Sequence, residues 1–409
     1  MARYYDRWIR KKKKNDVWEL ISLLDWRKAI GYKCVLRKKF KANGNLDKYK
    51  ERLVAKGFNQ QPSVDFVDTY SPVAKFASNR IIMSVVARMD LELHRLDVNT
   101  AFLNGELKED IFVLQPEGFE IKGHEDKVYK LKRSIYGIKQ SSKQWYLKFH
   151  QAILEIGFEM SPLDHCVYIW RCNDELTILS LYVDDILLAG NSPNMMSKTK
   201  SFLSSRFEMK DMGPTTYVLG IKITRDKNTK LLYLDQKNYL EKILKKFNMA
   251  ESKALRMSVS KGTILSKNMR PKDKEKQEFM KNVPYAQDVG SLMYVMISIR
   301  LDICHAVWLI SRYQSNPGRV YWQAVKRIFR YLQGTKNMKL YFGINDLEVI
   351  GYTDANFAED VDDRKSTNGH VFLFGGTIFS WLSKKQSCVA KYTMEAEYIS
   401  CSTAVSEAF

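Results

Sequence analysis

The stretch LSLYVDDILLAG, residues 179 to 190, sets two adjacent carboxylates, Asp184 and Asp185, into an apolar run of strand-forming residues. Side chains alternate along a strand, so neighbouring acids can share a target only where the chain turns. The run therefore predicts a tight hairpin with both acids at its tip. Because no Lys or Arg lies within the run, a divalent cation bound through oxygen ligands would balance the charge; a solvated turn is the alternative.

The charge of the chain indicates a polyanionic partner. Lys and Arg number 66 against 46 Asp and Glu, which gives a formal net charge of +20 over 409 residues. Nucleic acid is the simplest partner for such a charge, and an acidic membrane surface is the weaker alternative because no basic amphipathic helix with an exposed apolar face is evident. No apolar window approaches the length of a membrane span, so no membrane partner is expected.

The ends and cysteines of the chain indicate an intracellular protein. Residues 1 to 16 form a basic tail without the apolar segment of a secretory signal, and the run KKKK at 11–14 is either solvated or a nuclear signal. The six cysteines lack paired spacing, which indicates reduced thiols. We expect a cytoplasmic protein, with the nucleus as an alternative, and no secretion.

A cationic hairpin is predicted near the start of the chain. Two strand-like runs within residues 32–58 are joined at Asn43 and Gly44, a strong turn signal. The second run presents Lys50, Arg52 and Lys56 at even spacing, hence on one face. Such a face suits a triphosphate or a phosphate backbone, although a charged, solvated edge strand has the same pattern.

Two segments between this hairpin and the acidic run carry further signals. Asp97 ends a predicted strand, where it is either a functional acid or a turn and N-cap residue. From Ser142 onward, apolar residues at helical spacing predict a long amphipathic helix. The preceding loop YGIKQSS is glycine-containing, basic and aromatic, which suits approach to a nucleotide or plain packing.

Helices and a polar segment follow the acidic run. Residues 238–249 predict a helix with Lys242, Lys245 and Lys246 on its polar side, able to hold a duplex or to face water. Residues 251–282 are polar and lack apolar periodicity, which predicts a linker or long loop. A helical region with an ordinary core is expected from Tyr285 to about Thr335.

The last seventy residues predict three or four strands followed by one helix. Asp354 ends the strand that contains VIGYTD, and Glu395 and Glu397 lie near the start of the helix. Carboxylates there also suit the helix dipole, which is the simplest account of them.

Taken together, the chain resembles the reverse transcriptase region of a Ty1/copia-type retrotransposon Pol polyprotein followed by the beginning of its RNase H domain. The resemblance runs in order from about residue 17 to the C-terminus. The matching stretches include KYKERLVAKGFNQ, ELHRLDVNTAFLNGEL, KLKRSIYGIKQSSKQWY, LYVDDILLAG, YAQDVGSLMY, GYTDANFAEDVDDRKSTNGH and SWLSKKQSCVAKYTMEAEY.

The resemblance implies an α+β fold. Its parts would be a right-hand polymerase with fingers, palm and thumb at 17–260, a linker and helical connection at 261–345, and a C-terminally truncated RNase H-like α/β domain at 346–409. Carboxylates expected beyond Phe409 would be missing, so RNase H activity is not expected.

The resemblance also implies site residues. Asp97, Asp184 and Asp185 would be the catalytic carboxylates and would hold two Mg²⁺ ions, with Mn²⁺ as an alternative. The residues implied to contact the dNTP are Arg52 and Lys50 at the triphosphate, Phe102 against the ribose 2′ position, and Gly137, Gln140 and Ser141 in the loop near nucleotide and template. Asp354 and Glu397 would bind the RNase H metal, with Glu395 as the fallback.

The implied activity is RNA-directed DNA polymerisation. Its partners would be an RNA template, a DNA primer or RNA–DNA hybrid, and dNTPs. Cys34, Leu114 and Ser142 depart from the family pattern, which usually has Trp, an acid and Pro at these places. The alternative is therefore a catalytically inactive, nucleic-acid-binding remnant of such an element.

Overall fold

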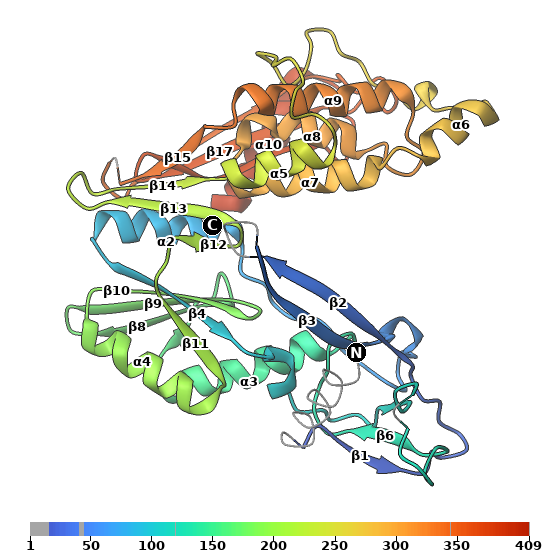
Figure 1. Ribbon diagram of the computed structural model, residues 1–409. Coiled ribbons are helices and arrows are strands. Elements are labelled where there is room, and N and C mark those ends of the chain that lie inside the picture. Colours follow the sequence, from blue (N-terminus) through green and yellow to red (C-terminus); the bar gives the residue numbers. More distant parts are fainter. Residues whose placement is uncertain (1–15, 41–44, 119, 344, 409) are drawn as a thin grey trace. The chain divides into compact units, whose positions relative to one another are not determined.

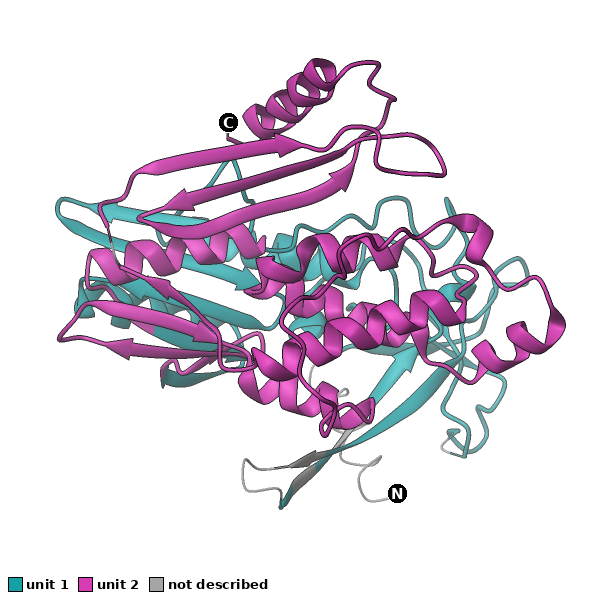
Figure 2. Cartoon of the chain, turned by 90° about the horizontal axis from the view of Figure 1, so that it is seen from above, with its two compact units in different colours: residues 1–74, 94–213 teal, residues 75–93, 214–409 magenta. Residues whose placement is uncertain are grey.

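The computed structural model describes all residues except 1–15, 41–44, 119, 344 and 409 (Figure 1). The chain forms two compact units, shown in different colours in Figure 2: residues 1–74 with 94–213, and residues 75–93 with 214–409. The first unit contains β1 (Trp18–Ile21), β2 (Tyr32–Phe40), β3 (Leu46–Ala55), η1 (Gly57–Asn59), most of β4 (Glu92–Val98), η2 (Ala101–Asn104), β5 (Phe112–Val113), β6 (Val128–Leu131), α3 (Ser141–Glu155), β7 (Glu159–Met160), β8 (Val167–Cys172), β9 (Glu175–Tyr182), β10 (Asp185–Gly190), α4 (Pro193–Arg206) and most of β11 (Met209–Pro214).

The second unit contains helices around a shared core, together with two sheets. Its elements are α2 (Phe76–Arg88), β12 (Tyr217–Val218), β13 (Ile221–Asp226), β14 (Leu231–Asp235), α5 (Lys237–Lys246), η3 (Lys267–Met269), α6 (Lys274–Lys281), α7 (Tyr285–Ser298), η4 (Leu301–Ile303), α8 (Cys304–Ser311), α9 (Arg319–Gly334), β15 (Lys339–Phe342), β16 (Val349–Ala355), β17 (Thr367–Phe374), β18 (Thr377–Lys385) and α10 (Thr393–Ala408). The expected mixture of helix and sheet is confirmed.

A six-stranded sheet organises the first unit. Its order is β11-β4-β10-β9-β8-β7, so strands β4 and β10 are neighbours although some 90 residues separate them in the chain. Trp145, Phe149 and Ile153 of α3 are buried in the core beneath this sheet, as their helical spacing predicted. The neighbouring strands and the helix beneath them fix the place of the acidic run.

The hairpin predicted from LSLYVDDILLAG is present. Strands β9 and β10 pair antiparallel with Asp185 opposite Tyr182, which leaves Val183 and Asp184 as the two-residue turn. Val183 has φ of +57°, a left-handed conformation that is unfavourable for a β-branched residue. The chain therefore accepts local backbone strain at the acidic tip.

The cationic hairpin is also present. Strands β2 and β3 pair antiparallel over nearly their whole length, from Tyr32 opposite Ala55 to Lys39 opposite Lys48. The predicted turn at Asn43 and Gly44 lies outside the described residues. A separate three-stranded sheet, β1-β6-β5, completes the first unit.

The second unit has one apolar core for α5, α7, α8 and α9. Leu240 and Ile243 of α5 pack with Val289 of α7 and Val325 of α9 in a single buried cluster. The helical region expected from Tyr285 is confirmed. Helix α5 shares its core with these later helices and belongs to the same compact unit, while the predicted domain boundary between residues 260 and 261 stays a prediction. No described helix is long and apolar enough to cross a membrane.

The predicted linker at residues 251–282 is instead packed on the helices. The hydroxyls of Tyr313 and Tyr321 donate to the carbonyl oxygens of Leu265 and Ser266 at 2.8 and 2.6 Å, and Leu265 is buried. The segment ends in α6. It is anchored through backbone carbonyls, which leave no apolar periodicity in the sequence. Apart from η3 and α6 the segment is irregular, so of the two predicted alternatives the long loop is the one observed.

Candidate functional site

Asp97 and the hairpin tip lie side by side. The backbone N–H of Val98, at the end of β4, donates to the carbonyl oxygen of Asp184 at 2.8 Å. Burial raises the pKa of Asp185, and the negative charges of Asp184 and Asp97 raise it further. The fold therefore brings the three acids close enough for their charges to act on one another.

Arg95 neutralises one of these acids. Its Nε and Nη2 donate to the same oxygen, Oδ1 of Asp185, at 2.8 and 2.6 Å. Both side chains are mostly buried, with 27% and 20% of their surface exposed, and the ion pair counteracts the rise in the pKa of Asp185. Arg95 lies two residues before Asp97 and hence on the same face of β4. That spacing was the available signal, and the sequence interpretation missed it.

The three carboxylates have the type of donor atom that a divalent cation prefers, but they are not arranged as a metal site. Carboxylate oxygens are the donors that Mg²⁺ prefers, and a bound cation would relieve the repulsion between neighbouring carboxylates. Asp97 and Asp184 have no ion pair within the described part of the chain, whereas Asp185 is engaged by Arg95. Among the described residues, no three acidic, His or Cys side chains are arranged to hold a metal ion.

Helix α3 holds the strained tip in place. The indole Nε1–H of Trp145 donates to the carbonyl oxygen of Val183 at 2.6 Å. Trp145 is buried, and a small cavity of about 40 Å³ lies between it, Val183 and Phe102. A hydrogen bond to the residue with the unfavourable φ offsets part of its conformational cost.

Tyr136 connects the acids with two other predicted residues. The guanidinium carbon of Arg52 lies 5.3 Å from the centroid of the Tyr136 ring, and the ring of Phe102 lies 4.9 Å from it on a tilted plane. Burial raises the pKa of Tyr136, Arg52 lowers it in part, and Asp184 and Asp97 raise it. Arg52, Phe102 and the acids therefore surround one phenol. Its position directly before Gly137 was the only sequence signal for it.

The loop after Tyr136 is packed against the segment that carries Gln60 and Asp65. Gln140 is fully buried: its side chain donates to the carbonyl oxygen of Asp65 at 2.9 Å and accepts from the amide of Gln60 at 3.1 Å. The hydroxyl of Ser141, also buried, donates to the carbonyl oxygen of Ile135. Both side chains are thus engaged by other groups of the protein, and their contact with a nucleotide stays a prediction.

Two glycines join this loop to the end of β3. Gly137 has φ of +99°, and a Cβ atom there would lie 2.2 Å from the carbonyl oxygen of Ala55. A Cβ atom on Gly57 would lie 2.0 Å from the carbonyl oxygen of Gly137. Only glycine permits this contact of backbone on backbone. The side chain of Lys50, also predicted to contact the triphosphate, lies outside the described residues.

The acids predicted for a second metal site lie on a strand and a helix that pack together. The hydroxyl of Ser400 on α10 donates to the carbonyl oxygen of Asp354 on β16 at 2.7 Å. Glu397 is one turn before Ser400, and Asp354 is exposed. Glu395 instead accepts from the backbone N–H of Lys391 at 2.6 Å, so it caps the helix start. This favours Glu397 over Glu395.

Lys242, Lys245 and Lys246 form an exposed cationic face on α5. The apolar residues Leu240 and Ile243 are buried on the other side, so the predicted division of faces is confirmed. What the lysines bind stays a prediction.

Comparison with known proteins gives consistent results. Residues 15–261 match the family model described as reverse transcriptase (RNA-dependent DNA polymerase). The chain is 44% identical over 387 residues to a retrovirus-related Pol polyprotein from transposon TNT 1-94 of Nicotiana tabacum, covering 94% of this chain and 29% of that protein. It is 37% identical to the corresponding polyprotein of transposon RE1 of Arabidopsis thaliana, covering 92% and 25%.

A shorter relative is covered completely. The chain is 31% identical over 315 residues to a transposon Ty5-1 protein of Saccharomyces cerevisiae, covering 76% of this chain and 100% of that protein. A foamy viral protease-reverse transcriptase solved with double-stranded DNA has a TM-score of 0.46 at 13% identity, covering 97% of this chain and 58% of that one. The chain spans less than a third of the two plant polyproteins. It belongs to the reverse transcriptase family, alongside the Pol polyproteins of Ty1/copia-type transposons.

Proposed function

We propose that the chain is an RNA-directed DNA polymerase that adds dNTPs to the 3′-OH of a primer paired with an RNA template. The observation that carries this proposal is the meeting of Asp97 with the Asp184–Asp185 tip beside Arg52, Tyr136 and Phe102. Nucleotidyl transfer needs positioning and charge neutralisation more than covalent chemistry from the protein. Acids beside the Arg52 cation and the tilted aromatic pair of Phe102 and Tyr136 supply both.

In this proposal, parts of both units have roles in polymerisation. The six-stranded sheet is the palm and the β2–β3 hairpin belongs to the fingers, while the helices of the second unit are the thumb and connection. Arg52 pairs with the triphosphate, and Phe102, kept in place by Tyr136, excludes a ribose 2′-OH by its bulk. Trp145 keeps the tip at a fixed position through Val183. Gln140 and Ser141 hold the loop in place next to the nucleotide.

The carboxylates of Asp97 and Asp184, joined by that of Asp185 once Arg95 releases it, are the residues that would hold Mg²⁺ or Mn²⁺. A divalent ion bound there would neutralise the triphosphate and favour ionisation of the primer hydroxyl. The chain's own contribution is to bring Asp97 of β4 next to the tip of the β9–β10 hairpin, and release of Asp185 from Arg95 is the rearrangement that binding requires.

Primer extension tests the proposal. The protein is incubated with an RNA template, a labelled DNA primer, dNTPs and Mg²⁺. Asp184→Asn is the informative variant, because Asp184 has no ion pair in the described structure whose loss would change the fold. Asp174→Asn removes an exposed carboxylate at the opposite end of the same hairpin and serves as the matched control. We expect extension by the wild type and the control, and a loss of at least about 100-fold in Asp184→Asn.

A second candidate function is a nucleic-acid-binding protein without polymerase activity. The ion pair between Arg95 and Asp185 favours it, because an internal cation already occupies one of the three acids. Filter binding of an RNA–DNA duplex at increasing salt, combined with the extension assay, separates the two functions. Binding with no extension above the Asp184→Asn level would select the second function and reject the first.

A further inference from the structure

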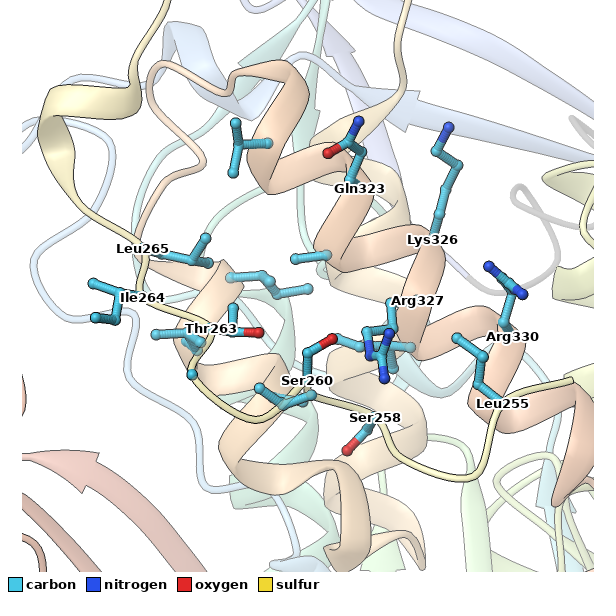
Figure 3. Close-up of a pocket in the computed structure, with 18 of the residues that line it drawn as sticks. Leu255, Ser258, Ser260, Thr263, Ile264, Leu265, Gln323, Lys326, Arg327 and Arg330 are labelled. Atoms are coloured by element: carbon cyan, nitrogen blue, oxygen red, sulfur yellow. The ribbon is translucent and has the colours of Figure 1, made fainter.

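The second unit contains a cavity of about 690 Å³ that the polymerase proposal does not use. It lies between helices α8 and α9 and the segment 255–265, which passes over them (Figure 3). Its floor consists of aliphatic side chains from all three. This volume is typical of sites for small organic ligands, and the combination of an apolar floor with a few polar groups is the usual composition of such sites.

Three cations of α9 line the cavity. They are Lys326, Arg327 and Arg330, and no acidic residue is present among the described residues of the lining. Arg330 donates through Nε to the carbonyl oxygen of Lys253 at 2.8 Å, which fixes its side chain to a residue that precedes the covering segment. A cavity with three positive charges and no negative one selects for a multiply charged anion.

Arg327 is the cation directed at the covering segment. Figure 3 shows its guanidinium extending toward the segment that carries Ser258 and Ser260, whereas Lys326 and Arg330 extend away from it. Its Nε is shielded from water and has no hydrogen-bond partner, and no ion pair is found for it within the described residues. A shielded, unpaired donor on a charged group is costly, and an anionic oxygen would satisfy it.

The covering segment provides hydroxyl groups. Ser258, Ser260 and Thr263 all line the cavity, and no hydrogen bond of their hydroxyls is found in the described structure. A guanidinium together with several free hydroxyls is a common donor set for the oxygens of a phosphate group. A single phosphate fills only a small part of the cavity, so the apolar floor would receive an attached organic group.

We propose that this cavity binds a small phosphate monoester: Arg327 and the hydroxyls of the covering segment hold the phosphate, and the aliphatic floor holds the body of the ligand. The phosphate chemistry has two sources, a free mononucleotide or the backbone of a nucleic acid. The apolar floor and the size of the cavity favour the free ester.

Isothermal titration with AMP, with inorganic phosphate and with a short DNA duplex tests the proposal. Divalent cations are left out, so that nucleotide binding at the polymerase acids is minimised. The variants are Arg327→Gln and Ser260→Ala; the second removes only a hydroxyl without a structural hydrogen bond. Arg319→Gln removes the same charge from an exposed position at the start of α9 and is the matched control.

We expect AMP to bind the wild type and Arg319→Gln equally, and to bind Arg327→Gln at least tenfold more weakly. Ser260→Ala should weaken AMP binding by about threefold, and inorganic phosphate should compete with AMP. The proposal is overturned if AMP does not bind, or if Arg319→Gln loses as much affinity as Arg327→Gln. Duplex binding that depends on Arg327 but is not displaced by AMP would also overturn it, in favour of a backbone phosphate.

Discussion

The burial of Asp288 leads to the prediction that the second unit becomes less stable as the pH rises. It lies on α7 with none of its surface exposed, and neither carboxylate oxygen has a hydrogen-bond partner in the described structure. Its neighbours in the helical core are apolar, among them Val289 and Leu292. Burial raises the pKa of Asp288 from 3.8 to about 7, and the positive charge of Lys246 on α5 opposes this rise only in part.

The size of the effect follows from this shift. The folded chain keeps the proton of Asp288 up to about pH 7, whereas the unfolded chain loses it near pH 4. Since the unfolded state then binds fewer protons than the native state, the free energy of unfolding decreases as the pH increases through this window. At about 1.4 kcal/mol per pKa unit the full effect is about 4 kcal/mol, of which about 2.5 kcal/mol is lost between pH 5 and pH 8.

Denaturant unfolding followed by circular dichroism at several pH values measures this effect. Asp288→Asn keeps the size of the side chain but cannot ionise, so its unfolding free energy should vary less between pH 5 and pH 8 than that of the wild type, by about 2.5 kcal/mol. Glu251→Gln removes an exposed carboxylate of the same unit and should keep the wild-type pH dependence. If Asp288→Asn and the wild type have the same pH dependence, the carboxylate is not buried without a partner and the reasoning fails.

Three further outcomes are expected. Arg95→Gln should lower the unfolding free energy of the metal-free protein by about 1–2 kcal/mol and tighten Mn²⁺ binding, measured by electron paramagnetic resonance, because Asp185 is released; weaker Mn²⁺ binding would contradict this. Phe102→Ala should raise rNTP incorporation relative to dNTP roughly tenfold in single-nucleotide extension, and an unchanged ratio would exclude Phe102 from sugar selection. Gly137→Ala should destabilise the protein by about 2 kcal/mol or more in thermal unfolding, because its Cβ would collide with Ala55, and a wild-type melting temperature would contradict the close contact.

Local patterns predicted the parts of the site that depend on local geometry. The alternation of LSLYVDDILLAG was sufficient for the hairpin and its acidic turn, and the spacing of Trp145, Phe149 and Ile153 was sufficient for α3. Each of these features depends on residues that are close together in the sequence. The Lys face of α5 was predictable for the same reason.

Contacts between distant segments were not predictable in this way. The ion pair of Arg95 with Asp185 depends on β4 lying beside β10, and no pattern within either strand specifies that neighbour. Gln140 has an ordinary polar side chain whose burial becomes evident only when Gln60 and Asp65 are placed next to it. The packing of residues 251–273 uses backbone carbonyls, which are present at every residue and therefore leave no signal in the sequence.

The contact of Gly57 with Gly137 has a consequence for motion. No side chain lies between the two backbones. When one backbone moves, no intervening side chain can change its rotamer to accommodate the displacement. The β2–β3 hairpin, which carries Arg52, and the loop that carries Tyr136 should therefore move together. A rotation of this hairpin would move Tyr136 with it. The distance between the rings of Tyr136 and Phe102 would then change at the same time.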